Sequence, residues 1–229
     1  MSQVPSLDGK LILFANVNIV PDRYDDWQAA YDQLAAHVMA MEPGTITYYF
    51  GLPLEYADAP SRTPYMFAFE IYDSRSALYD VHLKSSTMAD RFLPDVLPAM
   101  TTGLDLAHYE FAGGFLDRDG SQEECGVMQD TKIRGVNAVA RAEVIGAMKM
   151  LSRAAEERAD EAGLLTFLAL RGQDDEVSAR IFARFRDRDT MERWARTAVV
   201  RGFWEVVKNG VKAMESRTYA PNGKGWLWK

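Results

Sequence analysis

Hydrophobic residues recur along this chain at two spacings, one typical of strands and one typical of helices. Segments rich in β-branched and aromatic residues predict strands at residues 11–20 and 65–73. Between them, apolar residues at helical spacing predict a helix over residues 21–41, with its start marked by Pro21 and Asp22. The first third of the chain is therefore predicted to contain both kinds of element in close succession.

The remaining pattern of the first half predicts two further strands and a second helical stretch. The strands are expected at residues 44–52 and 104–116, and a helical stretch at 76–102 is expected to break near Pro94 and Pro98. The first half thus follows the order β-α-β-β-α-β, which is the ferredoxin-like plan.

The second half repeats this order of elements. Its strands are predicted at residues 133–144, 163–172, 178–187 and 211–220, and its helices at residues 145–161 and 189–210. Two pairs of segments also match in sequence, EPGTITYYF with EAGLLTFLA and FEIYDSRSAL with ARFRDRDTME. The repeated order and the matching segments indicate an internal duplication.

A polar, charged stretch between the halves predicts the domain boundaries. We expect a first domain at residues 1–116, a linker at residues 117–131 and a degenerate second domain at residues 132–229. The one cysteine, Cys125, lies in this linker and is expected to be exposed.

The predicted fold class is α+β, with two ferredoxin-like β-α-β-β-α-β halves. In each half, helices would cover one face of an antiparallel sheet. Strands of both halves carry apolar residues on both faces, so the second face is also expected to be covered. The two halves are therefore expected to pack sheet to sheet as an internal pseudo-dimer, and two copies of the chain could form a homodimer.

Composition and charge narrow the classes of partner. The 229-residue chain has a formal net charge of −7, and its first half is the more acidic. Acidic surfaces repel phosphate backbones, so no nucleic-acid partner is expected. No apolar run is long enough to cross a membrane, the N-terminus does not resemble a secretory signal, and a single cysteine suits a reducing compartment. We therefore expect a cytoplasmic protein with no membrane partner.

The segments EPGTITYYF and MFAFEIYDSRSALYDVHLKSSTMADRF combine several motifs. Pro-Gly leads into a strand, a strand ends in aromatic-Glu-x-aromatic-Asp, and Ala-Leu is followed closely by a histidine and a serine. In these features the first half resembles the antibiotic biosynthesis monooxygenase domain of the dimeric α+β barrel superfamily. The second half keeps fewer of these residues and looks like a degenerate copy. The resemblance implies that the two halves form an intrachain dimeric α+β barrel.

The resemblance also implies a reaction. It suggests a cofactor-independent monooxygenase of secondary metabolism that oxidises a planar phenolic, anthrone or quinol-type substrate with molecular oxygen, without metal or flavin. Two alternatives remain open within the same fold. One is a polyketide cyclase or isomerase using the same pocket, and the other is a non-catalytic small-molecule-binding or stress-related protein. Haem degradation is disfavoured because residues 87–98 contain no histidine.

His82 is the first candidate for chemistry. It falls on the same side of its predicted helix as Leu78 and Ser85, among mostly inward positions. An imidazole there could accept a phenolic proton or hold a substrate oxygen, and packing against the sheet is its alternative role. Pairing the halves places Arg196 opposite His82, or Trp194 after a two-residue shift. Any chemistry is therefore expected in the first half.

Other candidates surround the same expected cavity. Asn16 and Asn18 share one face of the first strand, and the resemblance implies that one of them faces the cavity. Tyr72 would help to hold oxygen-bearing groups. Aromatic side chains are expected to contact the substrate, namely Trp27, Tyr48, Tyr49 and Phe92, with core packing as their alternative role. His37 and His108 have no second ligand at a metal-binding spacing, so no metal site is expected.

Overall fold

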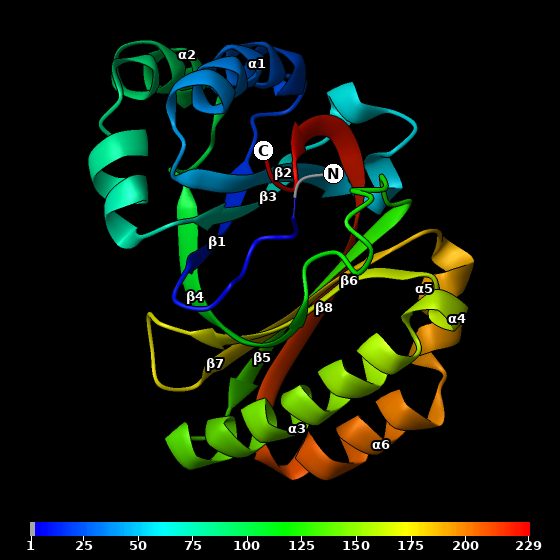
Figure 1. Cartoon of the computed structure of the whole chain (residues 1–229). Helices are drawn as coiled ribbons and strands as arrows, with labels where there is room; N and C mark the ends of the chain where they lie inside the picture. Colours follow the sequence, from blue (N-terminus) through cyan, green and yellow to red (C-terminus); the bar gives the residue numbers. More distant parts are fainter. Residues whose placement is uncertain (1–2) are drawn as a thin grey trace. The chain divides into compact units, whose positions relative to one another are not determined.

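The computed structural model describes residues 3–229 and divides them into two compact units (Figure 1). The first unit comprises residues 9–108 and 221–229. The second unit comprises residues 109–220 together with the N-terminal residues up to Asp8. None of the described helices is long and apolar enough to span a membrane.

The first unit carries the candidate residues. Its elements, in chain order, are β1 (Leu11–Asn18), α1 (Tyr24–Met41), β2 (Thr45–Pro53), η1 (Leu54–Tyr56), η2 (Pro60–Arg62), β3 (Tyr65–Tyr72), η3 (Ala77–His82), η4 (Met88–Phe92), α2 (Leu93–Val96), η5 (Leu97–Ala99) and the start of β4 (Asp105–Phe115). β3 lies between β1 and β2 and is antiparallel to both, with Phe14 opposite Phe69 and Tyr48 opposite Glu70. The stretch from Ala77 to Ala99, called here the 77–99 segment, consists of short turns, and η3 and η4 are π-helical.

The second unit has the same plan. Its elements are the end of β4, β5 (Val127–Gly135), α3 (Ala138–Glu157), α4 (Ala159–Ala162), β6 (Leu164–Gly172), β7 (Ser178–Phe185), α5 (Arg188–Ala195), α6 (Ala198–Val207), η6 (Lys208–Gly210) and β8 (Val211–Trp226), whose last residues belong to the first unit. The strand order is β8-β5-β7-β6-β4, and all neighbours are antiparallel.

The α+β class and the β-α-β-β-α-β order are confirmed in both halves. The compact units nevertheless differ from the predicted domains at residues 1–116 and 132–229. β4 and β8 each have residues in both units, and the predicted linker, residues 117–131, contains the first part of β5. Sheet-to-sheet packing of the halves and the homodimer stay predictions.

The start of α1 differs from the prediction. The helix begins at Tyr24 and not at Pro21, and the side chain of Arg23 at the N-cap position makes no capping hydrogen bond to the backbone. Asp22 does not cap it, since its own backbone has a φ of 63°. The backbone N–H of Arg23 instead donates to the carbonyl oxygen of Val20 at 3.1 Å, so a turn precedes the helix.

The strand predicted at residues 133–144 is wrong in its second part. β5 ends at Gly135, and α3 begins two residues after Val136, because the side chain of Asn137 accepts a hydrogen bond from the backbone N–H of Ala140 at 2.9 Å. Such a cap stabilises a helix start by about 1 kcal/mol. The prediction of an exposed Cys125 is also wrong, because this side chain is buried.

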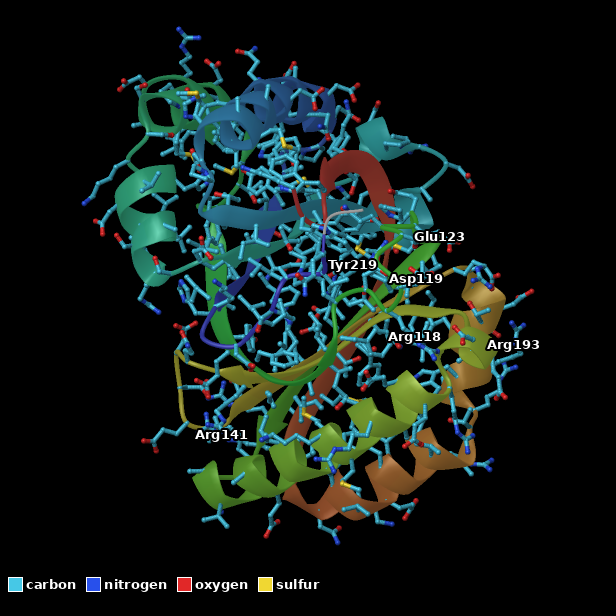
Figure 2. All side chains as sticks on the ribbon, in the orientation of Figure 1. Arg118, Asp119, Glu123, Arg141, Arg193 and Tyr219 are labelled. Atoms are coloured by element: carbon cyan, nitrogen blue, oxygen red, sulfur yellow. The ribbon has the colours of Figure 1, made fainter. Side chains whose placement is uncertain are left out.

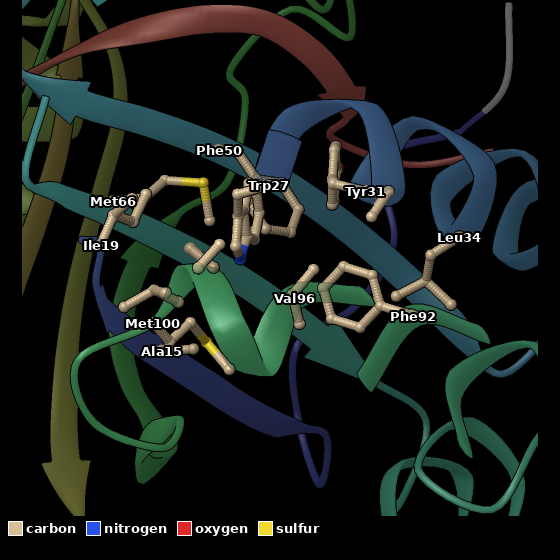
Figure 3. Close-up of a cluster of buried hydrophobic side chains, with 14 of the residues drawn as sticks. Ala15, Ile19, Trp27, Tyr31, Leu34, Phe50, Met66, Phe92, Val96 and Met100 are labelled. Atoms are coloured by element: carbon tan, nitrogen blue, oxygen red, sulfur yellow. The ribbon is translucent and has the colours of Figure 1, made fainter. Parts of the chain in front are cut away.

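A hydrophobic core fixes α1 and the 77–99 segment on one side of the sheet in the first unit. α1 contributes Trp27, Tyr31 and Leu34, and the 77–99 segment contributes Phe92 and Val96 (Figure 3). Full burial of a large apolar side chain stabilises the fold by about 1.5–3 kcal/mol. These contacts fix α1 and the irregular 77–99 segment over the strands, although the two lie far apart in the sequence.

In the second unit, α3 packs on the sheet through Met148 and Leu151, both part of a separate core. A side chain also ties this helix to the strands. Nη1 of Arg141 donates to the carbonyl oxygens of Gly172 and Asp175, at 3.3 and 3.0 Å (Figure 2). The helix start is therefore held to the turn that follows β6.

Candidate functional site

A cavity of about 40 Å³ lies in the first unit between the sheet, α1 and the 77–99 segment. Most of its wall is apolar and belongs to the core that surrounds it (Figure 3). Four side chains that line it carry titratable groups, namely Tyr31, Tyr48, Glu70 and His82. An apolar cavity with a few converging polar groups is typical of small-molecule sites.

Two hydrogen-bond donors in this wall have no partner within residues 3–229. They are Nε1 of Trp27 and the hydroxyl of Tyr31, and both side chains are at most 2% exposed. A buried donor without a partner costs about 1–3 kcal/mol, so folded proteins rarely keep one. An oxygen atom of a bound molecule would be a suitable acceptor for either donor.

His82 and Glu42 form a buried pair beside the cavity. Nδ1 of His82 lies 2.8 Å from Oε2 of Glu42, and each residue is 2% exposed. The fold places Glu42 at the C-cap of α1, where its backbone N–H donates to the carbonyl oxygen of Val38 at 3.2 Å. The hydroxyl of Thr45 donates to the same carboxylate oxygen at 3.2 Å. The end of α1 and the start of β2 thus hold the carboxylate in place.

Electrostatics keep this carboxylate ionised. Burial raises the pKa of Glu42. The hydrogen bond from His82 and the charge of its ring when protonated, with smaller contributions from Thr45 and His37, outweigh burial and bring the pKa below its ordinary value. An ionised carboxylate can only accept, so Nδ1 of His82 carries the proton and donates it. The other ring nitrogen, Nε2, then carries the lone pair in the neutral ring.

Nε2 of His82 is the nitrogen that a ligand can meet. Within residues 3–229, the bond through Nδ1 is the only hydrogen bond of the His82 imidazole. The imidazole also contacts two aromatic rings, with centroid distances of 5.7 Å to Tyr48 and 5.7 Å to Tyr72. These rings and Glu42 fix the orientation of the imidazole, while Nε2 keeps its capacity to accept a proton.

Glu70 and Tyr72 form a second buried pair on β3. The hydroxyl of Tyr72 donates to Oε2 of Glu70 at 2.7 Å. Burial raises the pKa of Glu70, and it raises the pKa values of Tyr72 and Tyr48 well above that of a free tyrosine. The two phenols are therefore protonated donors at neutral pH. The imidazole of His82 is the remaining group in the wall that can act as a base.

The structure gathers most of the candidates named from the sequence. His82, Trp27, Tyr48 and Phe92 line the cavity, and Tyr72 is joined to its wall through Glu70. These side chains come from α1, β2, β3 and the 77–99 segment. The expectation of one shared location is met for these residues, whereas their roles stay predictions.

Three other candidates lie elsewhere. β1 lines the cavity through Leu13, Ala15 and Val17, so Asn16 and Asn18 belong to the opposite face of the strand. Each asparagine has a protein partner. Nδ2 of Asn16 donates to Oδ2 of Asp105 at 3.2 Å, and Nδ2 of Asn18 donates to Oγ1 of Thr102 at 3.2 Å. Tyr49 alternates with Tyr48 along β2 and does not line the cavity either.

Sequence reasoning missed the contribution of Glu42 and of Tyr31. Glu42 stands in the segment EPG, where it reads as part of the turn that ends α1. Its contact with His82 depends on the packing of the 77–99 segment, for which no local pattern gives a signal. Tyr31 falls on the apolar stripe of α1, where a tyrosine is expected to pack.

The described residues show no group of three or more His, Cys, Asp or Glu side chains arranged to hold a metal ion. The expectation that the protein works without a metal or an organic cofactor is not tested by this observation and stays a prediction.

A sheet with helices, present twice in the order β-α-β-β-α-β, defines the chain as a tandem ferredoxin-like α+β protein. Comparison with solved structures gives neighbours of the same fold. A putative monooxygenase from Fusobacterium nucleatum aligns with a TM-score of 0.74 and 15% identity, over 96% of this chain and 95% of its own. An anthrone oxidase-like protein aligns with a TM-score of 0.66 and 14% identity, over 93% of this chain and 92% of its own.

A third neighbour carries the family description itself. A ferredoxin-fold protein from Listeria monocytogenes, described as related to antibiotic biosynthesis monooxygenases, aligns with a TM-score of 0.54 and 12% identity, over 95% of this chain and 98% of its own. The resemblance drawn from the sequence is thus confirmed in the fold of these neighbours. Identities this low show the fold alone. Neither the protein-family models nor the curated proteins gave a match to the sequence.

Proposed function

We propose that this protein is a cofactor-independent monooxygenase that oxidises a planar phenol, quinol or anthrone with molecular oxygen. The observation that carries the proposal is the buried His82–Glu42 pair, in which Nε2 of His82 remains open to a ligand in the cavity. The fold shared with proteins described as a monooxygenase and as anthrone oxidase-like supports the same class of reaction.

The reaction would start with proton transfer. Nε2 of His82 accepts a phenolic proton, and the resulting phenolate is richer in electrons than the neutral phenol. Molecular oxygen then takes up these electrons and bonds to a ring carbon. One oxygen atom stays on that carbon, and the other leaves as water with two hydrogens of the substrate. The balance is SH₂ + O₂ → SO + H₂O, where SH₂ is the substrate. SO is the quinone when SH₂ is a phenol or an anthrone, and the hydroxyquinone when SH₂ is a quinol.

Glu42 would act through His82 as a positioning residue. Its carboxylate holds the Nδ1 proton, so the imidazole keeps the tautomer with Nε2 open, and it stabilises the imidazolium that forms after proton transfer. Nε1 of Trp27 and the hydroxyl of Tyr31 would donate to a substrate oxygen. Asn16 and Asn18 have no part in this mechanism, since they lie on the other face of β1.

The size of the cavity limits the substrate. A volume of 40 Å³ is close to the space of about one water molecule in the liquid, so a ring can enter only if side chains move. Leu83, Met88 and Phe92 belong to the 77–99 segment, whose π-helical turns are of a kind often found at functional sites. We therefore propose that this segment moves outward on binding. Compact one- or two-ring quinols should be better substrates than three-ring anthrones.

A cyclase or isomerase is the second candidate, and one observation favours it. Burial raises the pKa of Glu70, which favours the protonated carboxyl, and this group lines the same cavity as the base His82. An acid and a base on one cavity can move a proton between two positions of a substrate without oxygen. Dependence on oxygen separates this candidate from the monooxygenase.

Oxygen uptake by the purified, metal-stripped protein tests the proposal. A panel of hydroquinones, naphthohydroquinones and anthrones is supplied, and wild type is compared with His82→Ala and with the exposed-site control Glu55→Ala. The proposal predicts uptake above the spontaneous rate with quinone formed in equal amount, lost in His82→Ala and kept in the control. Uptake that is unchanged in His82→Ala would refute the role of His82. Substrate turnover without uptake would favour the isomerase.

A further inference from the structure

The second unit contains a cavity of its own, which nothing in the proposed reaction uses. Its volume is about 270 Å³, compared with about 40 Å³ in the first unit. It lies between the strands β5 to β8 and the helices α3, α5 and α6. Its position relative to its own sheet and helices matches that of the first cavity.

Strand registers relate the two cavities residue by residue. In the first unit, Tyr48 on β2 lies opposite Glu70 on β3. In the second unit, Phe167 on β6 lies opposite Ala183 on β7, and both pairs line their cavities. One buried feature supports the match. Thr47 precedes Tyr48, and Thr166 precedes Phe167. Each threonine hydroxyl donates to a backbone carbonyl oxygen at the end of a neighbouring strand.

This relationship shows which groups the second cavity has lost. Tyr48 is replaced by Phe167 and Glu70 by Ala183, and two positions further along the strand Tyr72 is replaced by Phe185. A carboxyl group and two phenols are therefore replaced by apolar side chains. The smaller side chain of Ala183 also leaves room that Glu70 fills in the first unit.

The base is missing as well. Trp194 of α5 lines the second cavity, whereas the side chain of Arg196 is 76% exposed and donates to Glu192 at 2.9 Å. The sequence pairs His82 with either Arg196 or Trp194, and of these two only Trp194 lines the cavity. Glu161, which the sequence pairs with Glu42, is exposed. None of the residues that line this cavity carries an acid, an amine, an imidazole, a phenol or a thiol.

The walls suit a flat, uncharged molecule. Phe167 and Trp194 meet edge to face at a centroid distance of 6.0 Å, and Phe203 and Trp204 do so at 4.7 Å. Aromatic rings of this kind pack against other rings at favourable angles. A charged ligand would lose its hydration without gaining a partner in this wall. The volume equals that of about nine water molecules in the liquid, enough for a small ring system.

Polar groups stand at one side of the cavity, where it opens. Oγ1 of Thr131 lies 2.9 Å from Oγ of Ser216, and Nε2 of Gln129 donates to the same Oγ at 3.3 Å. Ser216 is exposed, and Met214 beside it is 52% exposed, so these residues mark the mouth. A hydroxyl or carbonyl oxygen on the edge of a bound ring would meet hydrogen-bonding partners there.

We propose that the second cavity is a binding site for a neutral, planar aromatic molecule with one oxygen-bearing edge, which it holds without converting it. The duplicated unit has kept a larger cavity in the same place, and apolar side chains replace the imidazole, the two phenols and the Glu70 carboxyl of the first unit. This inference does not depend on the reaction proposed for the first unit.

Calorimetric titration with 2-naphthol tests the inference. The variants are Ala183→Leu, which fills the second cavity, Ala68→Leu, which fills the first, and Met214→Trp, which narrows the mouth at a half-exposed position. We expect saturable binding by wild type, at least tenfold weaker binding by Ala183→Leu and Met214→Trp, and a change below twofold in Ala68→Leu. In His82→Ala, which removes the proposed base of the first cavity, recovery of unchanged 2-naphthol after incubation is expected.

Two results would overturn the inference. One is no saturable binding of 2-naphthol up to its solubility limit. The other is binding by Met214→Trp and Ala183→Leu that equals wild type, with the loss seen in Ala68→Leu instead. If Ala183→Leu fails to give the circular dichroism spectrum of the folded protein, Met214→Trp decides alone. Failure of oxygen uptake in the first unit would leave all of these results unchanged, so the two proposals are tested separately.

Discussion

Nδ1 of His82 donates to Oε2 of Glu42 across 2.8 Å, and the two residues are 40 positions apart in the chain. Both are buried, and neither could be paired with the other from local sequence. A carboxylate in contact with one imidazole nitrogen directs the other nitrogen to a ligand. The proposed chemistry of this protein rests on that relationship.

Replacing Glu42 by glutamine tests its positioning role. The amide has nearly the shape of the carboxylate but cannot stabilise an imidazolium by charge, so we expect kcat to fall by about tenfold or more with little change in KM. Nitrogen NMR of the imidazole supplies a second readout. In wild type Nδ1 should carry the proton, and in Glu42→Gln the two tautomers should mix. The exposed-site variant Glu55→Gln serves as the control, and an unaltered His82 tautomer in Glu42→Gln would contradict the assignment.

Glu70 and Glu42 should affect stability in opposite directions as the pH changes. Burial raises the pKa of Glu70, so its ionisation destabilises the folded state once the pH rises above the ordinary glutamate value. Glu70→Gln should therefore have a higher free energy of unfolding than wild type at pH 7, and the difference should shrink towards pH 4. Urea unfolding at both pH values measures it. Wild type exceeding Glu70→Gln at pH 7 would show that Glu70 is stabilised as a carboxylate.

For Glu42 the sign is reversed. Its pKa is lowered in the folded state, so its contribution to stability is present above the ordinary glutamate value and is lost as the pH falls through the folded-state pKa. Glu42→Gln should be less stable than wild type at pH 7 and should approach wild type under acid conditions. The same urea experiment provides the measurement. An equal deficit at pH 7 and at pH 3 would contradict the charge-based explanation.

Two tyrosine variants compare a buried hydroxyl that has a hydrogen-bond partner with one that has none within residues 3–229. Tyr72→Phe removes the donor to buried Glu70 and should cost about 1–3 kcal/mol of stability. Tyr31→Phe removes a buried hydroxyl that has no partner within residues 3–229, so it should be neutral or stabilising without ligand. Thermal or urea unfolding compares the two. A larger loss in Tyr31→Phe than in Tyr72→Phe would contradict the proposed role of Tyr31 as a donor kept for a ligand.

The sequence predicts most of the fold because its signals are local. The spacing of apolar residues predicts α1, and the run of aromatic and β-branched residues at 65–73 predicts β3. The start of α1 was wrong because Asp22, a typical capping residue, adopts a positive φ in a turn. The start of α3 was missed because the cap of Asn137 outweighs an alternating pattern that is typical of a strand.

The site is predicted less completely because it depends on contacts between distant segments. The place of His82 in an apolar stripe raised the question of its role, and the resemblance to the monooxygenase domain made it a candidate. Glu42 reads as a turn residue until the 77–99 segment is packed against it. The two asparagines of β1 were placed on one face correctly, but only the packing of α1 decides that the cavity borders the other face. Local patterns contain no information on this choice.

Labelled oxygen gives the most direct test of the central claim, which is that His82 in the first unit drives a monooxygenase reaction. The metal-stripped protein is given ¹⁸O₂ and the best substrate of the quinol panel, and the quinone is analysed by mass spectrometry. We predict a hydroxyquinone that carries one ¹⁸O atom per molecule, and no labelled product above background in His82→Ala. Labelled quinone formed equally fast by His82→Ala, or a product that carries no ¹⁸O, would contradict the account.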